Sequence, residues 1–155
     1  MLFRSSRVIE IDGRMDAQGH EIDPLDEATA HVALQDAFAD GYRAVAIVLM
    51  HGYRAPRHER VIADLARAVG FTQISASHDV SPLMKLVPRG LTSVVDAYLS
   101  PILRRYVARV SAGLPNNARL MFMQSNGGLT DGSLFRGKDA ILSGPAGGEI
   151  GRAHV

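Results

Sequence analysis

The chain lacks several features that would place it in particular classes of protein. Its 155 residues include no cysteine, which excludes disulfide bonds and thiolate metal sites. The formal net charge is +1, so there is no electrostatic basis for binding nucleic acid or an anionic membrane. The longest apolar run, residues 44–50, is far too short to span a bilayer, and the N-terminus shows no signal peptide. We therefore expect a cytoplasmic protein with no nucleic-acid or membrane partner.

Common catalytic and nucleotide-binding motifs are also absent. The sequence has no GxxxxGKS/T P-loop, no GxGxxG dinucleotide fingerprint and no GxSxG nucleophile elbow. Nothing in it supports nucleophilic catalysis by this segment alone. The composition, with 46% hydrophobic and 21% charged residues, is ordinary for a globular domain.

The residues that are present alternate between strand-like and helix-like patterns. We expect strands over residues 7–15, 43–50, 72–77 and 119–123. One helix should begin at the candidate cap Asp23 and stop before Gly41, and a second should cover residues 56–70. A long helix over residues 90–112 should continue through Pro101 with a kink, after a loop over residues 78–88. This order predicts an α/β layer fold with parallel strand pairing.

Two glycine-rich turns follow short apolar runs near the C-terminal end. The first comprises Gln124, Ser125, Asn126, Gly127 and Gly128, and the second covers residues 143–148. Backbone N–H groups in such turns bind phosphate or carboxylate. The amides and hydroxyl of the first turn also suit a lactam or imide ring. Two interpretations stay open for it, a ligand contact at a strand end or an Asn-Gly hairpin turn.

Two further sets of residues are candidates for ligand or metal binding. His51 ends a predicted strand, whereas His58 and Glu59 open the next predicted helix, so the three side chains could hold a divalent ion. The alternative is structural, since a histidine after a buried strand often binds a loop carbonyl. Arg89 could clamp a carboxylate or phosphate, or could be a solvated charge.

Five motifs in a fixed order carry a family resemblance. They are AIVLMHGY at residues 46–53, PRHE at 56–59, VPRGLTSVVDAYLSP at 87–101, MQSNGGL at 123–129 and SGPAGG at 143–148. Together they resemble the hydantoinase A/5-oxoprolinase family, whose members use ATP to open cyclic amides such as 5-oxoproline and hydantoins. Relatives of that family include subunits of ATP-dependent ketone carboxylases.

The resemblance implies a fold, ligands and site residues. The expected fold is part of one lobe of an actin-like (ribonuclease H-like) ATPase, with a mixed or parallel sheet, flanking helices and the long kinked helix. ATP and Mg²⁺ are the implied cofactors of the intact enzyme. The residues expected to contact substrate are Gln124, Ser125, Asn126, Gly127, Gly128 and Arg89. Ser143, Gly144 and Gly147 are the expected cofactor contacts, in a segment whose favoured role is a hinge between lobes.

The departures from the family pattern qualify that expectation. Family members carry Asp-x-Gly-Gly-Thr phosphate loops, and this chain has none. We expect residues 1–148 to be a partial hydantoinase/oxoprolinase domain that, by itself, neither binds ATP nor catalyses a reaction. Residues 149–155, EIGRAHV, match a translated sequencing adapter and are expected to be a non-native tail. The alternative function is a non-catalytic α/β module or subunit piece, which binds a partner subunit or the rest of its own chain.

Overall fold

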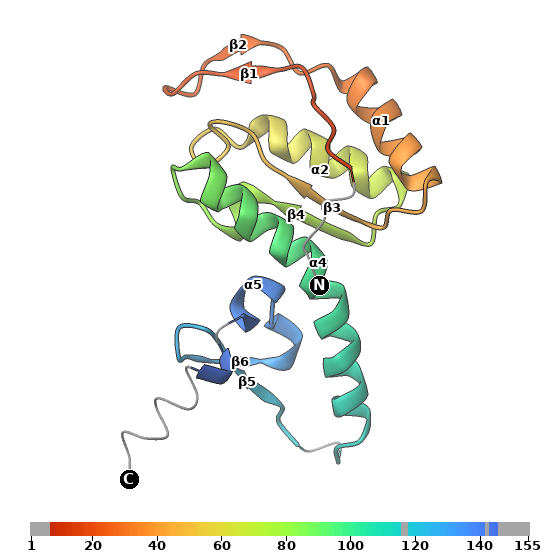
Figure 1. The fold of residues 1–155 in the computed structure, drawn as a ribbon, viewed down its shortest axis with the longest axis vertical. Helices are drawn as coiled ribbons and strands as arrows, with labels where there is room; N and C mark the ends of the chain where they lie inside the picture. The colour runs from red at the N-terminus through yellow and green to blue at the C-terminus, as the bar shows by residue number, and fades with distance from the viewer. Residues whose placement is uncertain (1–6, 116–117, 142, 146–155) are drawn as a thin grey trace. The chain divides into compact units, whose positions relative to one another are not determined.

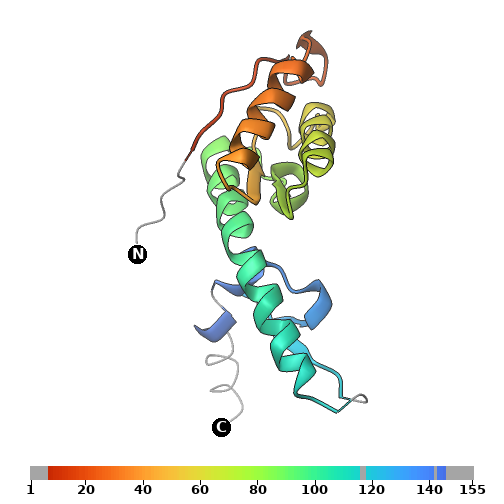
Figure 2. The same ribbon diagram turned by 90° about the vertical axis from the view of Figure 1, so that its right-hand side faces the viewer.

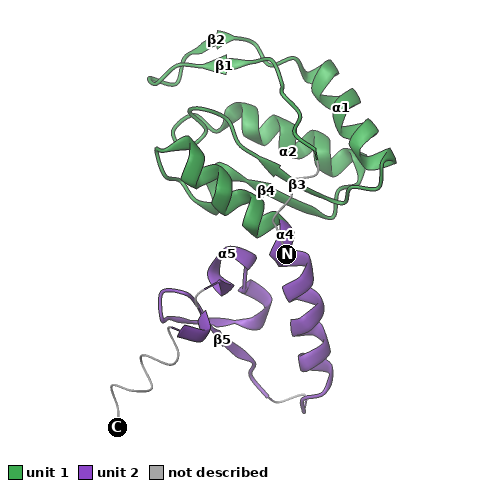
Figure 3. Cartoon of the chain, in the orientation of Figure 1, with its two compact units in different colours: residues 1–97 green, residues 98–155 purple. Residues whose placement is uncertain are grey.

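The computed structural model describes residues 7–115, 118–141 and 143–145 (Figure 1). The chain forms two compact units, residues 1–97 and residues 98–155 (Figure 3). The long helix α4, Leu86–Ala112, contributes its first part to unit 1 and the remainder to unit 2. None of the described helices is long and apolar enough to cross a membrane.

A pair of parallel strands lies at the centre of unit 1. Strand β3, Ala44–Ile47, pairs in parallel with β4, Gln73–Ala76, and Ile47 lies opposite Ala76 at the last step of the register. Both strands fall inside the predicted strand ranges, residues 43–50 and 72–77, and the predicted parallel pairing is confirmed. Because the two strands are parallel, their carboxyl ends meet at the same edge of the sheet.

Two helices on one side of this strand pair form the hydrophobic core with it. Helix α1, Glu27–Ala39, and helix α2, Arg57–Val69, lie side by side (Figures 1 and 2). Buried residues of both helices and Ile47 of β3 belong to the same core cluster. The buried core residues are Leu34, Ala37, Ile47, Ile62, Ala63, Ala66 and Phe71.

The start of α1 differs from the prediction, whereas its end agrees. Asp26, not Asp23, is the N-cap, and its carboxylate accepts hydrogen bonds from the backbone N–H (3.0 Å) and hydroxyl (2.7 Å) of Thr29. The bond from the Thr29 backbone lowers the pKa of Asp26 below its ordinary value. Asp23 belongs instead to a strand. Gly41 follows the C-cap with φ of +96°, and the surrounding hydrogen bonds form a Schellman motif.

A small hairpin precedes α1, where one strand was predicted. Only Arg14–Met15 (β1) of the predicted strand 7–15 is paired, and its antiparallel partner is Glu21–Asp23 (β2). Glu21 joins this hairpin to the first turn of α2. Its carboxylate lies 2.6 Å from Nε2 of the buried His58 and 3.3 Å from Arg57. The hydrogen bond with His58 lowers the pKa of Glu21.

The segment after β4 is more helical than predicted. Ser77–Val80 forms the short helix α3, and α4 begins at Leu86 rather than near residue 90. Pro88 falls in the first turn of α4, where the N–H that proline lacks would have no partner in the helix. The prediction of a loop over residues 78–88 is therefore wrong at both ends. The prediction of one helix continuing through Pro101 is confirmed.

Unit 2 consists of the remainder of α4 and a short hairpin. Strands β5, Met121–Met123, and β6, Leu129–Asp131, pair antiparallel and lead into a 3₁₀ turn, Gly132–Leu134, and into α5, Gly137–Ala140. Phe122 stacks on Phe135 with ring centroids 4.9 Å apart and meets Tyr106 of α4 edge-on at 6.3 Å. With one parallel and two antiparallel pairs, the described residues have the mixed α/β character that was predicted.

Candidate functional site

Glu59 connects the carboxyl ends of the two parallel strands. Its side chain is fully buried in the first turn of α2. Oε1 accepts hydrogen bonds from the backbone N–H of Leu49, 2.8 Å away after β3, and from the hydroxyl of Ser77, 2.6 Å away after β4. Oε2 accepts from the backbone N–H of His78 at 3.0 Å and lies 2.8 Å from Nδ1 of the same residue. A single carboxylate thus holds together two segments that follow neighbouring strands.

Gly52 leaves the space that this carboxylate occupies. A Cβ atom at position 52 would lie 2.2 Å from Oε1 and 2.5 Å from Cδ of Glu59. Real Cβ atoms do not approach other atoms so closely, so the backbone at Gly52 passes against Glu59 only because there is no side chain. The loop after β3 and the carboxylate are therefore packed as one unit.

Arg89 holds the same loop from the start of α4. Its guanidinium is fully buried and donates to the carbonyl oxygens of Leu49, Met50 (3.0 Å) and Leu83 (3.2 Å). It also lies 5.5 Å from the centre of the Tyr53 ring. These contacts make Arg89 a structural clamp on the loop, and the predicted contact with substrate finds no support in them.

The predicted metal ligands each have other surroundings. Glu59 binds the four donors described above, and Nε2 of His58 binds Glu21. Nδ1 of His51 and Nδ1 of His58 are buried without a hydrogen-bond partner. Within residues 7–115, 118–141 and 143–145, no three His, Asp or Glu side chains are grouped closely enough to hold a metal ion. The metal site stays a prediction that this arrangement does not support.

The turn from Gln124 to Gly128 is the tip of the β5–β6 hairpin. The N–H of Gln124 donates to the carbonyl of Gly128 at 2.7 Å, and Gly127 has φ of +83°. The Asn-Gly hairpin, one of the two open interpretations, is therefore the structure that forms. Ser125 donates from both its backbone and its hydroxyl to the carbonyl of Asp139, each at 2.7 Å, which ties the tip to α5. The side-chain amide of Gln124 has no hydrogen-bond partner in the described part of the chain.

Part of the second glycine-rich turn lies outside the described residues. Ser143 donates its hydroxyl to the carbonyl of Ala140 at 2.9 Å, and a Cβ atom at Gly144 would meet no atom within 4 Å. The backbone at Gly144 is thus open to its surroundings. Gly147 and residues 149–155 are outside the described residues.

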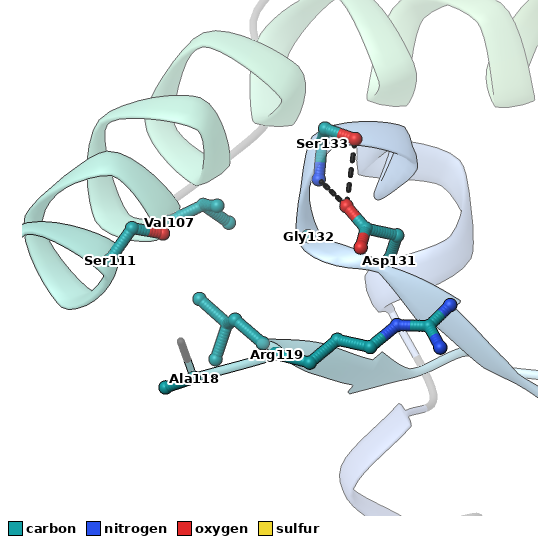
Figure 4. A pocket seen from close by; sticks show the side chains of 8 residues that line it. Val107, Ser111, Ala118, Arg119, Asp131, Gly132 and Ser133 are labelled. Carbon is teal, nitrogen blue, oxygen red and sulfur yellow. Dashed lines mark hydrogen bonds between the residues drawn. The ribbon is translucent and has the colours of Figure 1, made fainter. Parts of the chain in front are cut away.

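Unit 2 also contains a pocket of about 390 Å³ that the sequence did not indicate (Figure 4). Asp131 caps the 3₁₀ turn there, accepting from the backbone and hydroxyl of Ser133, and the backbone bond lowers the pKa of Asp131. No predicted site residue contributes to this pocket. The residues that line it are Val107, Ser111, Ala118, Arg119, Leu120, Asp131, Gly132 and Ser133.

Sequence reasoning missed Ser77 and His78. Both follow β4 directly, and a hydroxyl and an imidazole just beyond a buried strand were a usable signal. The sequence pattern places Ser77 at the end of a predicted strand and His78 at the start of a predicted loop, so it indicates no site for either residue.

Comparison with solved structures defines the class of the fold. The ATP-dependent caprolactamase from Pseudomonas jessenii superposes with a TM-score of 0.79 and 38% identity, over 88% of this chain and 20% of that chain. The nucleotide-free structure of acetone carboxylase gives a TM-score of 0.80 and 26% identity, over 93% of this chain and 21% of that chain. The chain is thus an α/β segment of an actin-like ATPase fold, as predicted.

Sequence comparison gives the family. The hydantoinase/oxoprolinase N-terminal region matches residues 1–70, and the hydantoinase/oxoprolinase family matches residues 89–155. This chain belongs to the hydantoinase/oxoprolinase family, which confirms the resemblance carried by the five motifs. The second match includes residues 149–155, whose non-native origin stays a prediction.

The curated relatives are much longer than the matched segment. The 5-oxoprolinase of Saccharomyces cerevisiae is 45% identical over 128 residues, which are 81% of this chain and 10% of that protein. Caprolactamase subunit alpha of P. jessenii is 38% identical over 142 residues, which are 88% of this chain and 20% of that protein. The chain therefore spans about a tenth to a fifth of these proteins.

Proposed function

We propose that the whole protein containing this chain is an ATP-dependent enzyme that opens a cyclic amide of the 5-oxoproline or hydantoin type. The observation that carries this proposal is the 45% identity to a 5-oxoprolinase, together with the 38% identity to a caprolactamase. 5-Oxoproline and caprolactam are both lactams, so the two relatives share the chemical problem of breaking an unstrained or weakly strained amide bond.

The chemistry would proceed by activating the amide oxygen. This oxygen would attack the γ-phosphorus of ATP, ADP would leave, and the ring N–H proton would pass to a base, which gives an imidoyl phosphate. Water would then add to the ring carbon, and the ring C–N bond would break with return of a proton to nitrogen, which leaves an acyl phosphate. A second water would hydrolyse this acyl phosphate to the carboxylate and inorganic phosphate. Mg²⁺ would neutralise charge on the transferring phosphoryl group. Both nucleotide loops would come from parts of the protein outside this sequence, since it has no Asp-x-Gly-Gly-Thr.

The hairpin tip is the part of this chain that we assign to substrate. The Gln124 amide is half-buried, provides both a donor and an acceptor, and has no partner among the described residues. Ser125, Asn126, Gly127 and Gly128 hold the tip in place, because Ser125 bonds to α5 and the Asn126 side chain accepts from the N–H of Gly128 at 2.9 Å. The N–H donors of the Gln124 amide match the carbonyl oxygen of a lactam, which can only accept.

The test is ATP turnover by the whole protein. Phosphate release should depend on 5-oxoproline or hydantoin, and the opened amino acid should form in equal amount. Gln124→Ala should raise the KM for the cyclic amide, whereas the matched variant Gln18→Ala, in the β1–β2 turn, should leave it unchanged. Absence of phosphate release with any cyclic amide would contradict the proposal.

A second candidate function is that of a subunit piece in an ATP-dependent ketone carboxylase. Two observations favour it: the similarity to acetone carboxylase, and a row of exposed apolar side chains on α4. Leu91, Tyr98 and Ile102 lie on one face of that helix and are 63%, 46% and 41% exposed. The covering segment would be a partner subunit or further parts of the same protein. Phosphate release that depends on acetone and bicarbonate, and not on a lactam, would favour this candidate.

A further inference from the structure

The carboxyl edge of the β3–β4 sheet carries two imidazoles. His51 follows β3 by four residues, and His78 follows β4 by two, at the edge where Ile47 and Ala76 end the register. In open α/β sheets, ligands bind outside the carboxyl ends of the strands. Nδ1 of His51 is buried without a partner. At least one polar atom at this edge, Nδ1 of His51, thus makes no hydrogen bond that holds the fold.

Glu59 fixes the orientation of the His78 ring. Each carboxylate oxygen already accepts from a backbone N–H group, Oε1 from Leu49 and Oε2 from His78. The carboxylate is thus the acceptor at its 2.8 Å contact with Nδ1 of His78, and Nδ1 is the donor. In the neutral ring, Nε2 then carries the lone pair, since the bond made by one ring nitrogen decides the state of the other.

Nε2 of His78 has no hydrogen-bond partner among the described residues. The side chain is 17% exposed, whereas that of Glu59 is not exposed at all. The ring is therefore largely covered and held at one end, with its free nitrogen open to a ligand. An acceptor fixed in this way loses little rotational entropy when a donor binds.

We propose that His78, oriented by Glu59, is a substrate-contacting residue whose Nε2 accepts a hydrogen bond from the ring N–H of a cyclic amide. This inference rests on the proposed function for the identity of the ligand. Phosphorylation of the amide oxygen requires that the ring nitrogen lose its proton, so an acceptor directed at that N–H suits the reaction. Glu59 acts as a positioning residue, since it touches the ring and not the substrate.

The test uses the whole protein that contains this chain, with ¹⁵N-labelled histidine, observed by NMR. Without ligand, at a pH where the ring is neutral, His78 should show a protonated Nδ1 and a bare Nε2. Titration with 5-oxoproline should shift the Nε2 signal of His78 until it saturates. The N-methyl derivative of 5-oxoproline has no ring N–H and should leave the signal in place.

Two matched variants separate a ligand contact from a structural role. His78→Asn keeps a side-chain N–H close to the position of Nδ1, so Glu59 retains its donor while Nε2 is removed. The dissociation constant for 5-oxoproline should rise about tenfold, the effect of one lost hydrogen bond. His20→Asn makes the same change in another histidine whose Nδ1 contacts a carboxylate, at 2.9 Å from Asp16, and should bind 5-oxoproline as the wild type does.

Three outcomes would overturn the inference. The first is a His78 ring with the hydrogen on Nε2. The second is binding of 5-oxoproline that leaves the Nε2 signal unmoved and is equally tight in His78→Asn; the lactam would then remain the substrate of the proposed function. The third is that no signal of the chain moves with 5-oxoproline, in which case ATP turnover by the whole protein still decides the proposed function separately.

Discussion

Replacing Gly52 with alanine should disrupt the junction between β3, β4 and α2. The new Cβ atom would lie 2.2 Å from Oε1 of Glu59, well inside the contact distance of the two atoms. The carboxylate cannot swing toward solvent, because it is fully buried and bonded at both oxygens. Either the loop that carries Gly52 or the carboxylate must move, and both movements break the hydrogen bonds at Oε1.

The size of the effect follows from those bonds. Oε1 accepts from Leu49 and Ser77, and a hydrogen bond to a charged group contributes about 1.5–3 kcal/mol. Losing both should lower the free energy of unfolding by roughly 3–6 kcal/mol. A small domain is stable by only about 5–15 kcal/mol, so the variant should lose a large share of its stability.

Urea denaturation followed by circular dichroism measures this change. With a slope of about 1–3 kcal/mol per molar urea, the midpoint of urea unfolding should fall by roughly 1–6 M. Gly144→Ala is the matched control, because its Cβ atom would meet nothing within 4 Å, and its stability should stay within about 0.5 kcal/mol of wild type.

The cause can be separated from a general intolerance of the loop to alanine. Glu59→Asp shortens the side chain and withdraws the carboxylate from the space next to position 52. The double variant should therefore be at least about 1 kcal/mol more stable than the sum of the two single changes predicts. A Gly52→Ala protein within about 1 kcal/mol of wild type, or strict additivity in the double variant, would refute the reasoning.

Three further predictions concern other contacts. Asp26→Ala removes the N-cap of α1 and should lower the Tm by about 2–4 °C. Because the folded-state pKa of Asp26 is depressed, the difference in Tm between variant and wild type should be complete above about pH 4 and vanish as pH falls through that pKa. Thermal melts at several pH values measure this dependence. Glu21→Gln should loosen the β1–β2 hairpin from His58, so backbone amides of the hairpin should exchange severalfold faster at neutral pH. The difference in exchange rate between variant and wild type should fade as pH falls through the depressed pKa of Glu21. Equal exchange rates at neutral pH would exclude this contact as the anchor of the hairpin. Gly137→Ala would place a Cβ atom 2.8 Å from the backbone nitrogen of Ser100 and should cost about 1–3 kcal/mol in a urea titration, whereas a neutral result would show that α5 and α4 are not in close contact.

Local signals predicted most of the regular structure. Three signals each depend on residues that are close together in the chain, so they can be recognised in the sequence. They are the apolar run of β3, Gly41 at the end of α1 and the helical period across Pro101. The predicted cap Asp23 was wrong because its structure depends on a residue farther away in the chain. It pairs with Arg14 in the β1–β2 hairpin, and the pairing moves the start of the helix to Asp26.

The candidate site was only partly predictable for the same reason. Glu59 and Arg89 were both recognised as unusual, but as a metal ligand and a substrate clamp. The structure gives each of them backbone partners that are far away in the sequence: Arg89 binds Leu49 and Met50, 40 and 39 positions earlier. His78, which has the open ring nitrogen, was assigned to a loop.

The sequence by itself therefore determined the family, the α/β class and the order of the three long helices and of strands β3, β4 and β5, because motif order and hydrophobic period are properties of the chain. The tertiary structure alone decided what each polar residue does. Parallel pairing of β3 and β4 brings two strand ends to one edge, and a buried carboxylate is stable there only when several donors converge on it. Those donors come from residues 10 to 19 positions away from Glu59, and their convergence depends on packing that no local pattern encodes.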